Sequence, residues 1–148
     1  MITKKDLYKE IPHLTHSQEV RIRFNETDAM GIVWHGNYIS YFEDGRESFG
    51  RAHGISYPEI LAAGFTTPIV KSSCEHKLSL RYGDVIRVDT TFVNTPAAKI
   101  IFKYKIFNSQ NDLVCTGETT QVFLDKDGNL QLNNPPFYAN WKSKMELE

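Results

Sequence analysis

The chain has 148 residues, which is the length of one domain and enough to bury a core without disulfides or a structural metal. Its formal net charge of −1 excludes a global basic field that would recruit nucleic acid, so any anionic ligand must be held by a few local groups. No apolar run is long enough for a membrane span, and the polar first ten residues lack the apolar core of a signal peptide. We therefore expect a single cytoplasmic domain over residues 1–148.

The first half of the chain contains one predicted strand and two predicted helices. Residues 1–17 show no period and are expected to form a lead-in or a short helix, whereas residues 20–24 alternate apolar and basic side chains as a half-buried strand does. Residues 37–53 are predicted to be one helix, because apolar side chains recur there at helical spacing. A second, shorter helix is predicted over residues 57–65. Gly45 lies in the apolar stripe of the long helix, where we expect it to let another backbone come close.

The second half of the chain changes to a period of two, which is typical of strands. Four strands are predicted, over residues 70–82, 86–92, 100–106 and 113–124, followed by a tail of residues 135–148 with a terminal helical segment. The joining turns are tight, so strands that follow one another are expected to pair antiparallel. Only the long helix carries an apolar stripe that can cover the apolar face of this sheet. The predicted fold class is therefore α+β, with a long curved antiparallel sheet wrapped around a central helix.

The two cysteines give no sign of a metal centre. Cys74 and Cys115 are isolated from each other in sequence, and neither belongs to a Cys-x-x-Cys pair. We expect both to be reduced thiols in the core. His76 shares a strand face with Cys74 two residues away, which would suit a metal site or a Cys–His pair, but core packing is the expectation for such neighbours.

The most specific pattern in the chain runs from Phe24 to Tyr38, FNETDAMGIVWHGNY, and is followed by FEDGR over residues 42–46. It combines an Asp, an Ala-x-Gly-Ile-Val-aromatic stretch, an Asn-Tyr pair and, on the helix, an acidic residue with an arginine. This pattern resembles the signature of the 4-hydroxybenzoyl-CoA thioesterase family, and in particular its YbgC-like acyl-CoA thioesterase branch. The similarity extends over residues 15–136.

This resemblance implies the hotdog fold and the hydrolysis of an acyl-CoA thioester to a free acid and CoA. It implies no metal and no cofactor, since coenzyme A is part of the substrate. The family pairs two protomers edge to edge and builds each site at their junction, so we expect a homodimer or homotetramer. No nucleic-acid partner and no membrane span are expected.

Asp28 is the predicted catalytic carboxylate. An acid in a glycine-containing loop before a helix is otherwise a cap or a loop-ordering residue. A thioester carbonyl needs a nucleophile or base, together with donors that stabilise the developing oxyanion. The ionised carboxylate can supply the first as nucleophile or as general base on water, and these two roles remain open. The helix N-terminus can supply the second, and the resemblance assigns the polarising backbone N–H to His35.

The remaining predicted site residues surround this pair. The His35 imidazole is either a hydrogen-bond partner of substrate or water, or a packed interface residue. Gly36 is expected to permit close backbone approach, and Asn37 to cap the helix or orient Asp28. Trp34 and Phe65 are predicted to line the acyl pocket.

Glu43 is a weaker alternative to the loop carboxylate, because some hotdog thioesterases carry their acid on the helix. We expect it to pair with Arg46 instead, as Glu47 is expected to pair with Arg51.

Two other functions remain open for the whole chain. One is hydrolysis of acyl-carrier-protein thioesters, and the other is a non-catalytic acyl-CoA-binding module that keeps the fold without the chemistry.

Overall fold

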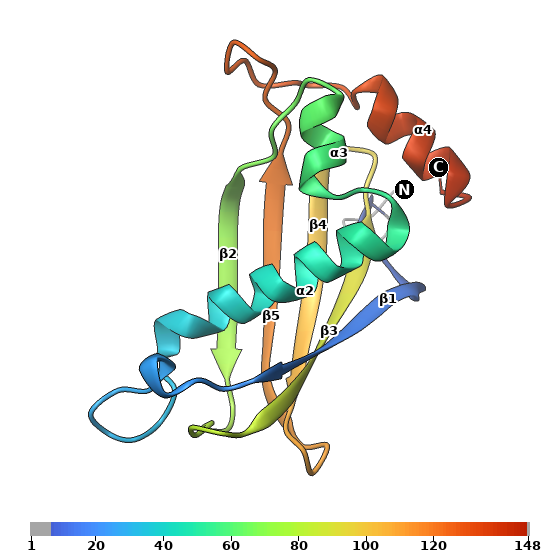
Figure 1. Ribbon diagram of the computed structural model, residues 1–148. Helices are drawn as coiled ribbons and strands as arrows, with labels where there is room; N and C mark the ends of the chain where they lie inside the picture. The colour runs from blue at the N-terminus through green and yellow to red at the C-terminus, as the bar shows by residue number, and fades with distance from the viewer. Residues whose placement is uncertain (1–6, 148) are drawn as a thin grey trace.

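The computed structural model describes residues 7–147 and contains one five-stranded antiparallel sheet (Figure 1). The strands lie in the order β1-β3-β4-β5-β2, so β1 and β2 form the two edges. Their bounds are Lys9–Arg21 for β1, Ile69–His76 for β2, Val85–Asn94 for β3, Lys99–Phe107 for β4 and Leu113–Val122 for β5.

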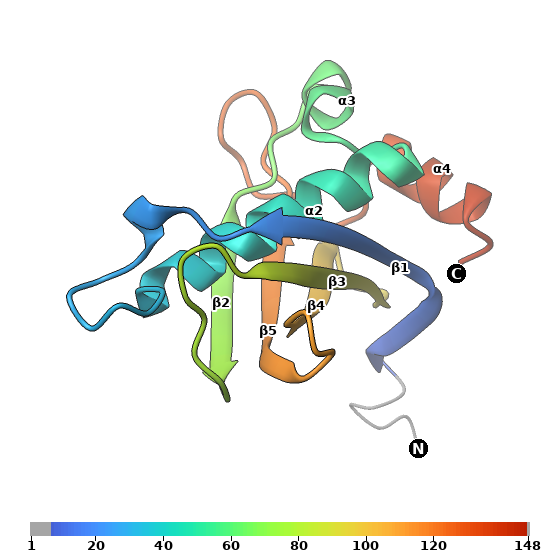
Figure 2. The same ribbon diagram turned by 60° about the horizontal axis from the view of Figure 1, so that its bottom comes forward.

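Helix α2 (Tyr38–His53) crosses one face of this sheet, and the sheet curves around it (Figure 2). Two short 3-10 helices precede it, η1 (Phe24–Glu26) and η2 (His35–Asn37), and η2 runs directly into α2. Two further helices, α3 (Tyr57–Ala62) and α4 (Pro136–Lys144), lie near the C-terminal end of α2. The predicted α+β class, with a curved antiparallel sheet around a central helix, is confirmed.

Strand β1 begins at Lys9, so the lead-in expected over residues 1–17 is wrong from that point on. Residues 1–6 lie outside the described part of the chain. The strand predicted over residues 20–24 is only the end of β1, and it stops at Arg21. The preceding part of β1 went unpredicted because its first half is mainly polar, with only Leu14 buried before Val20. Its backbone pairs with β3, with a register irregularity between Glu10 and Thr15, and a ladder of this kind does not depend on side-chain alternation.

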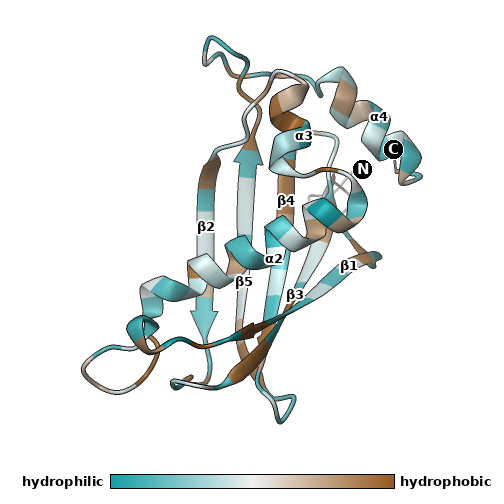
Figure 3. Cartoon of the chain, viewed as in Figure 1, coloured by the Kyte–Doolittle hydropathy of each residue, from teal (hydrophilic) through white to brown (hydrophobic). Residues whose placement is uncertain are grey.

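Strand β2 ends at His76, six residues before the predicted end, and it pairs with β5 rather than with β3. The chain then runs alongside the loop that precedes α2, where the Leu80 carbonyl accepts a hydrogen bond from the Val33 amide at 2.8 Å. The turn at Gly83 leads into β3, which lies three positions away from β2 in the strand order, next to the opposite edge strand β1. The expected pairing of successive strands therefore fails here, and β2 is left as an edge strand that is mostly teal and white beyond its first residues in Figure 3.

Side chains of α2 and the sheet form the core. Phe42 and Phe49 are fully buried, and Phe42 stacks on Tyr104 of β4 with ring centroids 4.3 Å apart. A Cβ at Gly45 would overlap the Thr90 side chain of β3, so glycine is required for the helix to lie this close to the sheet. The helix ends as predicted at Gly54, which adopts a left-handed φ of 75°.

Aromatic side chains fill the region where α4 meets the sheet and α2. Trp141 packs on Phe92 with centroids 5.1 Å apart, and its indole Nε1 donates a hydrogen bond of 2.7 Å to the His53 carbonyl. Tyr138 is likewise buried and contacts Phe123. Helix α4 is the terminal helix predicted from the tail, and it closes the end of the molecule farthest from the loop that precedes α2 (Figure 1).

Candidate active site

The segment between η1 and η2 is a tight loop held by its own backbone. Thr27 and Val33 form an isolated antiparallel bridge, and the Asp28 amide donates to the Ile32 carbonyl at 2.9 Å. At its tip the Gly31 amide donates to the Asp28 carbonyl, and Gly31 adopts a φ of 78°, which favours glycine. The loop therefore has a defined geometry even though its tip is exposed.

The Asp28 carboxylate is half-buried and only partly engaged. Its Oδ1 accepts a hydrogen bond of 2.8 Å from the Met30 amide, which orders the turn. Its Oδ2 receives no hydrogen bond from any residue between 7 and 147. Asp28 therefore has the loop-ordering role considered from the sequence, and it still keeps one oxygen free to react.

The amide groups of His35 and Gly36 lie at the start of the helical run that continues into α2. Within the described chain, neither N–H donates a hydrogen bond to another residue, whereas the Asn37 amide donates to the Trp34 carbonyl at 2.9 Å. The first N–H groups of a helix lack intrahelical acceptors and carry the positive end of its dipole. They are therefore suited to bind a partial negative charge, and the role that the family resemblance implies for the His35 amide stays a prediction.

Asp28 and His35 line one surface cleft of about 310 Å³. Its other walls come from the loop, from Tyr38 at the start of α2, and from the end of β2 with the segment after it; they comprise Met30, Ile32, Val33, His76, Lys77, Leu78 and Ser79. Burial, with contributions from Cys115 and Cys74, raises the pKa of Tyr38 to about 12, so its phenol is neutral at physiological pH. A carboxylate, unpaired amides and apolar walls are the components that acyl transfer requires.

The sequence did not indicate the β2 side of this cleft. His76 was expected in the core, but it is exposed and lines the cleft with Lys77 and Ser79. The available signal was the shared strand face of Cys74 and His76. It could not show that β2 would end beside the loop that carries Asp28.

The predicted site residues Gly36 and Asn37 organise the loop and do not line the cleft. The Trp34 indole covers Gly36 so closely that a Cβ at Gly36 would overlap it, so the glycine makes room for a side chain rather than for a backbone. Asn37 occupies the N-cap position of α2, but its side chain makes no cap hydrogen bond. Instead, its Nδ2 donates to the Glu26 carbonyl at 2.7 Å, which ties η2 to η1. The predicted cap position is therefore correct, but the side chain does not cap the helix, and it makes no hydrogen bond to Asp28 among the described residues.

Trp34 and Phe65 are not among the residues that line the Asp28 cleft. The Trp34 side chain is 50% exposed and tilts against the His35 ring, with centroids 5.0 Å apart. Phe65 lies after α3 and packs on Phe137 of α4, with centroids 5.5 Å apart. Their assignment to an acyl pocket stays a prediction, and within this chain Phe65 belongs to the aromatic region around α4.

Glu43 forms the predicted ion pair with Arg46, and Glu47 pairs with Arg51 at 3.7 Å. The Arg46 guanidinium is buried and also donates to the hydroxyls of Tyr57 and Tyr104. Glu43 does not line the Asp28 cleft. Its role in this structure is to balance a buried positive charge.

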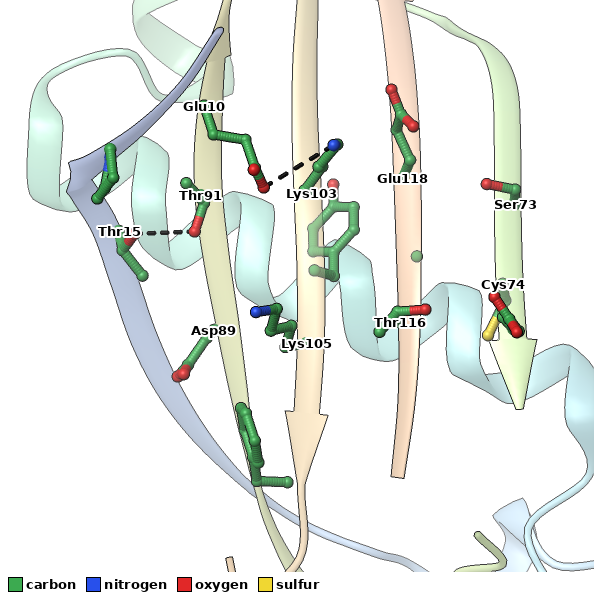
Figure 4. A pocket seen from close by; sticks show the side chains of 15 residues that line it. Glu10, Thr15, Ser73, Cys74, Asp89, Thr91, Lys103, Lys105, Thr116 and Glu118 are labelled. Carbon is green, nitrogen blue, oxygen red and sulfur yellow. Dashed lines mark hydrogen bonds and ion pairs between the residues drawn. The ribbon is translucent and has the colours of Figure 1, made fainter. Parts of the chain in front are cut away.

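A larger hollow of about 810 Å³ lies on the opposite face of the sheet, with α2 behind it (Figure 4). It is lined by alternating charged and hydroxyl side chains of the strands. Lys103 pairs with Glu10 at 3.9 Å, and the Thr15 and Thr91 hydroxyls are 2.8 Å apart. This face contains neither Asp28 nor the start of α2, so its greater volume does not make it the better candidate for acyl transfer.

Comparison with known proteins decides the family. The model described as the thioesterase-like superfamily matches residues 22–142. This chain belongs to the thioesterase-like superfamily. Acyl-CoA thioester hydrolase YbgC of Escherichia coli O6:H1 is 26% identical over 106 residues, which cover 72% of this chain and 79% of that protein.

Solved structures of CoA thioesterases share the fold. DHNA-CoA thioesterase of Staphylococcus aureus superposes with a TM-score of 0.81 at 27% identity, covering 89% of this chain and 91% of that one. The 4-hydroxybenzoyl CoA thioesterase of Pseudomonas sp. strain CBS-3 has a TM-score of 0.74 at 22% identity, covering 86% and 98%. The predicted family and its hotdog fold are confirmed, and the protein is an enzyme of the thioester hydrolase type.

The described part of the chain contains neither a helix suited to span a membrane nor a cluster of metal-ligating side chains. From residue 7 to residue 147, no helix is long and apolar enough to cross a membrane. Over the same residues, no three His, Cys, Asp or Glu side chains gather as a metal site would need.

Proposed function

We propose that this protein hydrolyses acyl-CoA thioesters to a free acid and CoA, with Asp28 as nucleophile or general base. One observation carries the proposal: Asp28, which keeps one carboxylate oxygen free, and His35, whose amide donates to no described residue, line the same cleft. The YbgC relative, which is named for this reaction, supports the choice of acyl-CoA as substrate.

The chemistry requires the thioester carbonyl oxygen to lie against the His35 and Gly36 amides. Negative charge that develops on this oxygen is then stabilised by two N–H donors and the helix dipole. Asp28 either attacks the carbonyl carbon, giving a mixed anhydride that water opens, or removes a proton from the attacking water. In both routes the C–S bond breaks, the thiolate leaves and is protonated to CoA, and water supplies the oxygen of the acid.

Two cationic side chains lie near the cleft and are suited to hold the phosphates of CoA. Lys77 lines the cleft, and Arg81 extends beside Gly31 at the loop tip. Both residues follow the end of β2 in the sequence. Arginine and lysine bind phosphate through charge-assisted hydrogen bonds.

We also propose that the protein works as at least a homodimer. Strand β2 is an edge strand with a single neighbour, and Ile69 and Val70 at its start are exposed. An exposed edge with apolar side chains is a typical site of pairing between chains. Light scattering should therefore give a dimer or tetramer, whereas a stable, active monomer would contradict the proposal. Cytoplasmic location and independence from cofactors stay predictions.

The decisive experiment measures free thiol release from a panel of acyl-CoA thioesters of varied chain length and substitution. Release that depends on Asp28 supports the proposal. Release from acyl-carrier-protein thioesters alone would replace CoA by the carrier protein as the natural substrate. Saturable binding of acyl-CoA without any thiol release would identify a non-catalytic binding module.

A further inference from the structure

His76 is a polar side chain in the cleft for which the proposed chemistry has no use. It stands at the last residue of β2, and its ring is exposed to the cleft that contains Asp28. Apolar side chains of Met30, Ile32 and Leu78 line the same cleft, beside the polar side chains of Lys77 and Ser79. An imidazole beside apolar side chains is a polar group that can orient a ligand.

Two contacts fix the position of this ring. On one side it meets the Tyr38 ring edge to face, with centroids 4.6 Å apart and an interplanar angle of 84°. On the other side its Nδ1 lies 3.9 Å from the Cys74 Sγ, within hydrogen-bond range for sulfur. Tyr38 is fully buried, so the contact comes from a rigid element. The ring is therefore held in place before any ligand binds.

The sheet register places a second thiol behind the first. His76 pairs directly with Cys115 across β2 and β5, and Cys74 pairs with Gly117, so both thiols and the imidazole lie on the same face of the sheet. Burial raises the pKa of both cysteines, which keeps their thiols protonated at neutral pH.

A protonated Cys74 can donate its S–H to Nδ1 of a neutral imidazole. Nδ1 then acts as acceptor, and the ring proton must be on Nε2. Nε2 is the ring nitrogen on the side away from the thiol. The environment of His76 thus favours one tautomer, in which the free nitrogen is a hydrogen-bond donor.

We propose that His76 is a specificity-determining residue whose Nε2–H donates a hydrogen bond to an oxygen substituent on the acyl group. The cleft consequently favours acyl groups that carry a hydroxyl or oxo group over unsubstituted chains of the same length. Cys74 is a positioning residue, because it acts only through the imidazole. This inference rests on the proposed acyl-CoA hydrolysis and adds to it the class of acyl group.

The preference follows from the cost of an unmade hydrogen bond. A plain alkyl group in contact with Nε2–H displaces water from the donor and offers no acceptor in return. A substituted acyl group restores the bond. Since the imidazole is partly solvated, we expect a discrimination of about tenfold in kcat/KM.

The test uses matched substrates and matched variants. Thiol release is measured for 3-hydroxybutyryl-CoA and butyryl-CoA, which differ by one hydroxyl, and the ratio of their kcat/KM values is the readout. His76→Gln places an amide N–H near the Nε2 position and should keep the ratio. His76→Phe keeps the ring contact with Tyr38 but has no donor, and the ratio should fall about tenfold. His76→Asn places its amide near the Nδ1 position. Its kcat/KM ratio should therefore fall as that of the phenylalanine variant does.

A ratio of two substrates on one variant is insensitive to partial unfolding, because both rates fall together. Equal ratios in the wild-type protein and all three variants would overturn the inference and leave the proposed hydrolysis intact. Absence of thiol release from every CoA thioester with wild-type protein would overturn both. Nitrogen NMR of the histidine rings adds a readout without substrate: His76 should show the Nε2–H tautomer and lose this preference in Cys74→Ala. A wild-type ring protonated on Nδ1 alone would overturn the assignment.

Discussion

The two ends of helix α2 lie in different surroundings. Its N-terminal end adjoins the loop that carries Asp28, where backbone hydrogen bonds fix the conformation and Met30 and Trp34 remain exposed. Its C-terminal end is covered by the aromatic region around α4, where Trp141 and Tyr138 are buried. Directional hydrogen bonds position a few reactive groups, whereas apolar burial supplies most of the free energy of folding. The comparison indicates that chemistry and stability are concentrated at opposite ends of one helix.

The largest effect is expected for Asp28→Asn at the N-terminal end. The amide keeps an oxygen that can accept the Met30 N–H, so the turn should persist, but the charge and basicity are lost. We expect kcat to fall by on the order of 10²–10⁴, with little change in KM or in the melting temperature. Steady-state kinetics and thermal unfolding on the same sample check this. Near wild-type turnover with a lowered melting temperature would make Asp28 a structural residue only.

The converse effect is expected for Trp141→Ala at the C-terminal end. Truncation removes a buried indole that packs on Phe92 and leaves the His53 carbonyl without its donor. The free energy of unfolding should fall by about 3–5 kcal/mol, measured by denaturant titration. Trp141→Phe is the control, because it keeps a ring and loses only the N–H. Below the melting transition, kcat should stay near the wild-type value. A large loss of kcat there would show that the C-terminal end of α2 also affects catalysis.

A smaller effect, on both turnover and stability, is expected for Asn37→Ala, which removes the link between η2 and η1. Its side-chain hydrogen bond to the Glu26 carbonyl contributes about 1 kcal/mol to stability. Because η2 carries the His35 and Gly36 amides, a loosened η2 should lower kcat about tenfold, more than it changes KM. Kinetics and chemical denaturation measure the two effects. Unchanged kcat with reduced stability would show that η2 keeps its orientation without Asn37.

The smallest effect concerns His53 and pH. Burial, and then the neighbouring His16, lower the pKa of His53 below its ordinary value of 6.5. Between this lowered pKa and 6.5 the unfolded chain binds more protons than the folded one, so stability falls as the pH is lowered through that window. The melting temperature of the wild-type protein should drop about 1–2 °C more than that of His53→Gln between pH 7.5 and 5.5. Parallel curves for the two proteins would contradict the shift.

Much of this protein follows from local sequence pattern. The stripe that contains Phe42 and Phe49 indicated α2, and Gly54 indicated its end, because helix periodicity and a left-handed stop depend on neighbouring residues. The motif around Asp28 indicated the family through its resemblance to a known signature. The loop that carries it is closed by hydrogen bonds within a few residues.

Tertiary structure alone decided the strand order and the far wall of the cleft. No local pattern states which strand lies beside which, so the sequence could not place β2 next to β5 or extend β1 back to Lys9. The same long-range pairing brings His76 to the cleft of Asp28, which is far away in the chain. Asp28 could be proposed from the sequence because the motif around it resembles that of a known family, and its catalytic role stays a prediction. His76 could not, because its surroundings exist only after the sheet has formed.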